Sequence, residues 1–208
     1  MVPDNACEMK KIKFTEVLND AISYFLLGDI IALKNYKTAK NLPDDLATEF
    51  TANESGDNVV KDGILIPLAE VDNCPYTIIF NLSDETPELL KDGNEPQVRQ
   101  DGYILKVESN KIMLFTWWIL NNFVDESIRE RIESQAKYNK PQVELENGWY
   151  KIEVLGGLTR QESEIINRQG EIVKIVEYEP TYEFIIKKTE EKKACTADIF
   201  HSYKLKTK

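Results

Sequence analysis

Residues 101–118 read DGYILKVESNKIMLFTWW and decide the fold class of this chain. Apolar Tyr103, Leu105 and Val107 alternate with Lys106 and Glu108, a period of two that is typical of a β-strand with one buried face. A turn at Ser109-Asn110 then leads into a second apolar run. The stretch therefore predicts a β-hairpin that is buried on one face.

Asp-Gly and Asn-Gly pairs mark further strand starts. Each stands directly before an apolar run: Asp62-Gly63 before ILIPLA, Asp101-Gly102 before YILKV, and Asn147-Gly148 before WYKIEVL. The runs IVKIVEY at 172–178 and TYEFIIKK at 181–188 are predicted as two strands joined by a turn at Glu179-Pro180, because proline suits a turn better than a paired strand. Residues 60–190 are thus expected to be rich in strands.

Two segments have a helical period instead. An amphipathic helix over 14–27, which Gly28 would end, is predicted by apolar residues at steps of three and four: Phe14, Val17, Leu18, Ala21, Ile22 and Phe25. The alternative is two strands joined by a turn at Asn19-Asp20. A second helix is predicted near 125–138, with Asp125 capping its start. The expected fold is α+β and strand-rich, with antiparallel, sandwich-like sheets and these two helices.

The rest of the chain completes the expected organisation. Residues 29–33 are predicted to form a short strand, and residues 35–58 a surface loop or short helix. The segment 187–208 has seven lysines against three acidic residues, and is expected to be mobile or to fold back on the acidic region. We expect a single domain, the alternative being an acidic subdomain over 1–100 and a strand-rich subdomain over 101–208.

Negative charge is concentrated between residues 41 and 101. This range holds fourteen Asp or Glu against three Lys or Arg, a net −11, while the whole chain has a net charge of −10. Such a surface repels nucleic acid and anionic membranes and attracts a basic protein. We predict that carboxylates there mimic phosphates and bind the partner; the alternative is that they only keep the protein soluble. The candidate partner-binding residues are Asp44, Asp45, Asp57, Asp84 and Glu85.

Few residues suit catalysis or metal binding. The three cysteines lack a C-x-x-C spacing, which favours a reducing compartment over disulfides or zinc. His201 is the only histidine, so we interpret it as a solvated tail residue and not as the catalytic partner of Cys195. No phosphate-binding glycine motif and no long apolar segment occurs in the sequence. We expect a soluble, cytoplasmic, non-enzymatic protein without cofactor or metal.

Three segments, DGYILKVESNKIMLFTWW, NGWYKIEVLGG and EPTYEFIIKK, together with the acidic surface, resemble strand-rich immunity or inhibitor proteins of bacterial toxins. The resemblance implies a protein that masks a basic surface of a toxin or another protein.

A second hypothesis is a β-sandwich or barrel that holds a small molecule or an enzymatic site. Its pocket would be lined by aromatic residues and one carboxylate: Trp149, Tyr150, Tyr103 and Trp117, with Glu153 or Glu108. A deep apolar pocket would favour this hypothesis, and a flat acidic face would favour partner binding. A third hypothesis is a subunit of a phage-like or secretion assembly, in which strands are exchanged between subunits.

Overall fold

Two sheets are formed by nine strands in the computed structural model, which describes residues 10–18, 22–166 and 170–207. The large sheet has the order β1 (Lys11–Val17), β4 (Pro75–Asn81), β9 (Ile172–Thr189), β8 (Gly148–Ile166), β5 (Glu95–Val107). The small sheet has the order β3 (Leu65–Ala69), β2 (Tyr24–Gly28), β6 (Lys111–Thr116), β7 (Gln142–Glu144). β4 and β9 run parallel, and the other neighbouring strands run antiparallel.

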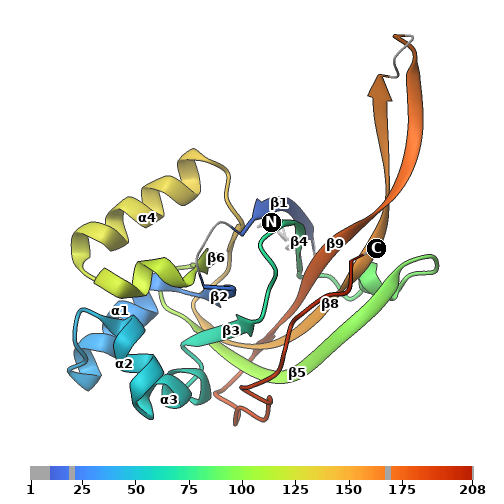
Figure 1. The fold of residues 1–208 in the computed structure, drawn as a ribbon. Helices are drawn as coiled ribbons and strands as arrows, with labels where there is room; N and C mark the ends of the chain where they lie inside the picture. Colours follow the sequence, from blue (N-terminus) through green and yellow to red (C-terminus); the bar gives the residue numbers. More distant parts are fainter. Residues whose placement is uncertain (1–9, 19–21, 167–169, 208) are drawn as a thin grey trace, which may run out of the picture.

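The sheets pack face to face around one apolar core (Figure 1). The ring of Phe25 on β2 lies 5.9 Å from that of Tyr76 on β4, which joins the small sheet to the large one. The large sheet contains strands from both halves of the chain, since β1 and β4 lie beside β8 and β9. The predicted fold class, strand-rich α+β with packed sheets, is confirmed.

The helices lie on the side of the small sheet that faces away from β8 and β9 (Figure 1). They are α1 (Ile30–Lys40), α2 (Leu46–Ala52), α3 (Ser55–Lys61) and α4 (Asp125–Lys137), together with the short 3₁₀ helix η2 (Trp117–Asn122), which contacts α2 and α4. A second 3₁₀ helix, η1 (Glu88–Leu90), instead contacts β5, β8 and β9 of the large sheet. The prediction of a helix near 125–138 is confirmed. Asp125 is not its cap, however: Val124 holds the cap position, and Asp125 forms an ion pair with Lys34, with Nζ and Oδ1 2.8 Å apart.

The predicted helix over 14–27 is wrong. The segment forms β1 and β2, which belong to different sheets, and the predicted turn at Asn19-Asp20 lies outside the described residues. Two members of the supposed apolar helix face, Val17 and Ile22, are 47% and 42% exposed. Pairing with β4 prevails because β1 gains a ladder of backbone hydrogen bonds and contacts such as Phe14 against Phe80, with ring centroids 5.9 Å apart.

The predicted strand over 29–33 and the predicted hairpin after Val107 are wrong for a shared reason, the buried side chain of Asp29. Its Oδ1 accepts the N–H groups of Ile31 and Ala32 at 2.9 and 3.2 Å, so the chain starts α1 instead of extending β2. Its Oδ2 accepts the N–H groups of Glu108 and Ser109, both at 2.7 Å. The turn at Ser109-Asn110 thereby passes the chain from the large sheet into the small one, so β5 and β6 do not pair.

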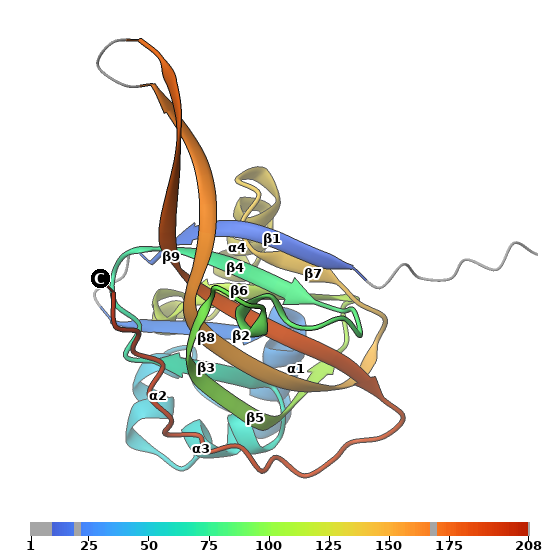
Figure 2. The ribbon, with the colours of Figure 1, turned by 90° about the vertical axis from the view of Figure 1, so that its right-hand side faces the viewer.

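The predicted turn at Glu179-Pro180 is also wrong, because β9 runs without interruption through Pro180. Pro180 is opposite Leu158 of β8, and pairing with β4 begins only one residue later, at Thr181. A proline at that position costs no hydrogen bond to β4. As a result β8 and β9 form one long hairpin that extends well beyond the body of the molecule (Figures 1 and 2).

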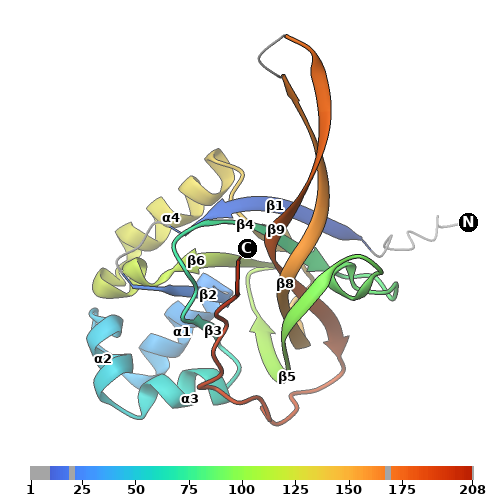
Figure 3. The same ribbon diagram turned by 45° about the vertical axis from the view of Figure 1, so that its right-hand side comes forward.

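The C-terminal segment folds back over the body, as one of the two predictions for it stated. Figure 3 shows it running from the end of β9 towards α3 and then along β3 to the C-terminus. Tyr203 and Leu205 are buried in the core, and Tyr203 N–H donates to the carbonyl of Ala69 at 2.9 Å. Contacts with the acidic region include the ion pair of Lys192 with Asp62, at 3.4 Å.

Replacing Asp29 by alanine is expected to lower the free energy of unfolding by roughly 3 kcal/mol, because buried donors lose their acceptor. For a chain of this size that corresponds to a fall in Tm of roughly 6–12 °C. Asp45→Ala is the matched control, since Asp45 also caps a helix but is exposed and accepts hydrogen bonds from the first turn of its own helix. Thermal unfolding followed by circular dichroism should show a much smaller fall for the control; equal falls would contradict the role given to Asp29.

Candidate functional site

The five carboxylates predicted to bind a partner already have partners within the chain. Asp57 pairs with Lys61 and Glu85 with Lys11, each with nitrogen and oxygen 3.2 Å apart. Two more lysine pairs and one helix cap account for the rest: Asp44 with Lys37, Asp84 with Lys187, and Asp45 as the cap of α2. Hydrogen bonds from the Thr48 hydroxyl and N–H hold the pKa of Asp45 below its ordinary value.

These carboxylates are not gathered into one site either. Asp44, Asp45 and Asp57 lie in or beside α2 and α3, whereas Asp84 and Glu85 follow β4 of the large sheet (Figure 1). The first three carboxylates therefore belong to the helical layer and the last two to the large sheet, so they do not form one continuous site. Exposed, paired carboxylates of this kind contribute little to stability individually.

The feature that sequence reasoning missed is the outer part of the β8–β9 hairpin, residues 160–166 and 170–179, which we call the arm. Beyond Leu158 and before Thr181, no described strand pairs with the outer edges of the arm. Figures 1 to 3 show it standing clear of both sheets. Among the side chains of the arm that the structure describes, five large apolar ones are exposed: Ile166 (73%), Ile172 (69%), Val176 (46%), Tyr178 (39%) and Val173 (38%).

The root of the arm is fastened to the body by hydrogen bonds. Arg160 N–H donates to Asn94 Oδ1 at 2.8 Å. The amide of Gln161 donates to the hydroxyls of Thr77 and Thr159, at 2.9 and 2.8 Å, and Lys13 donates to its Oε1 at 2.7 Å. The direction in which the arm leaves the body is therefore fixed by side-chain contacts as well as by the strand ladder.

Beside this root lies a hollow of about 280 Å³ that has an acidic rim, which we call the notch. Glu162, Glu177 and Glu179 line it together with Tyr76 and other residues of β4 and β8. Within the part of the chain that the structure describes, no lysine or arginine forms an ion pair with these three glutamates. The notch, unlike the five predicted carboxylates, therefore presents negative charge that is not locally neutralised.

A groove of about 560 Å³ lies elsewhere, between β5, β8, β9 and the C-terminal segment. Of the predicted pocket residues, Tyr103 and Glu153 line it. Trp149 lies nearby, with Lys192 Nζ 5.3 Å from its ring centroid. The others are not brought here: Tyr150 is buried in the core, Trp117 packs against Tyr24 at a ring distance of 5.2 Å, and Glu108 pairs with Lys106.

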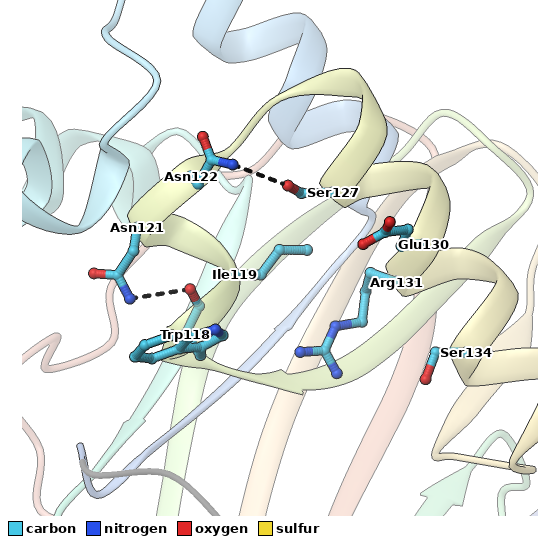
Figure 4. Close-up of a pocket in the computed structure, with 8 residues that line it drawn as sticks. All are labelled: Trp118, Ile119, Asn121, Asn122, Ser127, Glu130, Arg131 and Ser134. Carbon is cyan, nitrogen blue, oxygen red and sulfur yellow. Dashed lines mark hydrogen bonds between the residues drawn. The ribbon is translucent and has the colours of Figure 1, made fainter.

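A third hollow, of about 400 Å³, lies between η2 and α4 (Figure 4). Trp118, 68% exposed, borders it opposite Arg131, and its carbonyl accepts a hydrogen bond from the Asn121 amide at 3.0 Å. Asn122 donates to the hydroxyl of Ser127 at 3.3 Å. The apolar run at 111–118 forms a strand only as far as Thr116, because η2 begins at Trp117. Of the two adjacent tryptophans, Trp118 is the exposed one.

A cluster of buried tyrosines fixes the C-terminal segment that walls the groove. The hydroxyl of Tyr203 donates to that of Tyr103 at 3.0 Å, and Tyr182 donates to the carbonyl of Tyr203. Burial raises the pKa of Tyr103 to about 12, and it raises the pKa of Tyr182 and of Tyr203 as well. His201 is half-buried with its ring 5.1 Å from that of Tyr203, so its interpretation as a solvated residue is wrong.

The described residues contain no group of three or more His, Cys, Asp or Glu placed to hold a metal ion. In the same residues, no helix has both the length and the apolar character that crossing a membrane requires.

Comparison with known proteins leaves the chain without an assigned class. No family model and no curated protein matches it. The solved structure of crocagin biosynthetic gene J is similar over 85% of this chain and 98% of that chain, with 11% sequence identity and a TM-score of 0.43. A likeness at this level supports no inference on fold or function.

The tyrosine cluster generates a prediction on alkaline pH. Above the ordinary tyrosine pKa near 10, the unfolded chain loses phenol protons that the folded chain keeps up to a pKa of about 12 at Tyr103. Stability is therefore fully present below pH 10 and falls as the pH rises towards 12. The Tm of the wild type should decline more steeply over this range than that of Tyr103→Phe/Tyr203→Phe. Lysine ion pairs weaken equally in both proteins, so parallel curves would contradict the prediction.

Proposed function

We propose that this protein is a non-enzymatic binding protein that docks onto a basic surface of another protein through the arm and the notch at its root. The observation that carries the proposal is the exposure of five large apolar side chains on a two-stranded ribbon that projects from the body. An isolated two-stranded hairpin is only marginally stable in water, and exposed apolar patches of this kind mark interaction sites.

The register of the arm places its apolar residues for contact with a partner. Paired residues of antiparallel strands point to the same side, so Ile166, Ile172, Val176 and Tyr178 share one face of the ribbon. Full burial of one such side chain is worth about 1.5–3 kcal/mol. A partner that covered this face would therefore gain affinity from a few residues, the usual pattern of protein interfaces.

The notch supports the choice of a basic partner. Its three glutamates have no described counter-ion, and the whole chain has a net charge of −10. Negative charge at the root would guide a positively charged protein towards the arm by long-range attraction. The partner class remains the one expected from composition, but the contact moves from residues 41–101 to the arm, because the acidic side chains singled out there are already paired.

The resemblance to immunity and inhibitor proteins supports one form of this function, in which the arm and notch mask the basic surface of a toxin domain. In this form of the proposal, the arm would enter a cleft of the partner and the body would stay outside it. Inhibition would then result from occupation of the cleft, without any chemical step.

The proposal predicts two separable defects in binding. Ile172→Ser/Val176→Ser should weaken affinity at least tenfold through faster dissociation, because the buried apolar contact is lost. Glu162→Gln/Glu177→Gln/Glu179→Gln should slow association and reduce its dependence on salt, with little effect on dissociation. Asp57→Asn/Asp84→Asn/Glu85→Gln is the matched control: it removes three charges from paired carboxylates and should change neither rate.

A photo-crosslinking residue at position 176 in the protein's own cells identifies the partner, and binding kinetics with the purified partner then measure both defects. A basic partner whose binding follows the two predicted patterns supports the proposal. Equal effects of the control triple and the notch triple would overturn the electrostatic part. Crosslinking only to a second copy of this chain would overturn the proposal in favour of self-association.

A further inference from the structure

Lysine side chains gather around the groove between β5, β8, β9 and the C-terminal segment, although the chain as a whole is acidic. Lys151, Lys187 and Lys193 line it. On β8 and β9 the side chains next to Lys151 and Lys187, such as Ile152 and Ile186, are in the core. Because side chains alternate across a sheet, the two lysines project from the opposite face, away from the small sheet.

The floor of the groove between these lysines is apolar. Ile104 of β5 and Ile185 of β9 contribute to it. The volume, about 560 Å³, is in the range of sites for small organic molecules. A ligand that fits both features has an apolar body and a negatively charged group.

One wall of the groove is the C-terminal segment, which is held against β5 by specific contacts. Thr196 N–H donates to the carbonyl of Gly102 at 2.9 Å, and a Cβ at Gly102 would lie only 2.4 Å from Thr196 Oγ1. Gly102 also has a φ of 84°, which favours glycine. The C-terminal segment can therefore close over β5 only because this position has no side chain, and the tyrosine cluster fixes the same segment further on.

The balance of charge inside the groove favours an anion. Lys187 and Lys193 pair with Asp84 and Glu191, neither of which lines the groove. The side-chain ammonium group of Lys151 makes no hydrogen bond or ion pair with a described residue. Of the two acidic residues that line the groove, Glu153 is held by Arg99, which leaves Asp101 at the edge beside Gly102.

From these observations we infer that the groove binds an amphipathic organic anion, with its apolar body on Ile104 and Ile185 and its carboxylate, sulfonate or phosphate group at Lys151 and Lys193. An ammonium–anion hydrogen bond is among the stronger polar contacts that a protein makes. The groove and the arm have different lining residues, so this inference does not depend on the proposed binding of a protein partner.

The test uses 8-anilino-1-naphthalenesulfonate, a fluorescent amphipathic anion, in titrations monitored by fluorescence and by calorimetry. The wild type should bind one molecule saturably. Lys151→Glu/Lys193→Glu should weaken this binding at least tenfold, and both lysines are exposed, so the variant should keep the wild-type melting temperature. The uncharged N-phenyl-1-naphthylamine should bind the wild type at least tenfold more weakly than the sulfonate, and its binding should not respond to the charge reversal.

The arm variant Ile172→Ser/Val176→Ser distinguishes the groove from the other exposed apolar surface, and it should bind the sulfonate as the wild type does. Loss of binding in that variant would overturn the inference, because the probe would then report the arm. Binding that is not saturable, or that the lysine reversals leave unchanged, would overturn it as well.

Discussion

Five hydrogen bonds to one buried carboxylate, that of Asp29, hold the two halves of the fold in register. Its oxygens accept from two N–H groups at the start of α1, from two at the end of β5, and from the hydroxyl of Ser109. Burying a carboxylate is costly unless its oxygens are fully satisfied, and here they are. One residue therefore decides that β2 ends in a helix and that the chain leaves the large sheet for the small one after β5.

Many acidic side chains of this molecule are neutralised by lysines within the chain, and others are not. Acidic residues between 41 and 101 pair with lysines from distant elements, such as Lys11 on β1 with Glu85 and Lys187 on β9 with Asp84. These ion pairs neutralise part of the negative charge that the sequence concentrates between residues 41 and 101. Among the charges that keep no ion pair within the described residues are the glutamates of the notch and Lys151 in the groove, and there a hollow lies beside the charge, which is why we propose binding at those places.

The sequence by itself determined the class of fold and most of the strand-forming segments. Period-two alternation and Asp-Gly or Asn-Gly entries located the strands around Tyr103 and Ile152, and the apolar run after Ser109-Asn110 located the strand around Ile112. The helical period of 125–138 located α4, because signals of this kind act over a few neighbouring residues. Of the six residues named for a pocket in the second hypothesis, Tyr103 and Glu153 line the groove, and their role in binding stays a prediction. A signal for the arm was also present, since IVKIVEY is apolar on both faces although charged residues flank it.

Only the tertiary structure decided which strands pair, where charge is neutralised and which apolar residues stay exposed. A strand leaves its edge hydrogen bonds to be satisfied by any partner, so the pairing of β1 with β4 or of β9 with both β4 and β8 is set by contacts far apart in the chain. The same holds for Asp29, whose role depends on donors about 80 residues away. The local sequence pattern indicates whether a segment tends to form a strand or a helix. The neighbouring strand with which it pairs follows from the packing of the whole chain, and so do the arm, the notch and the groove.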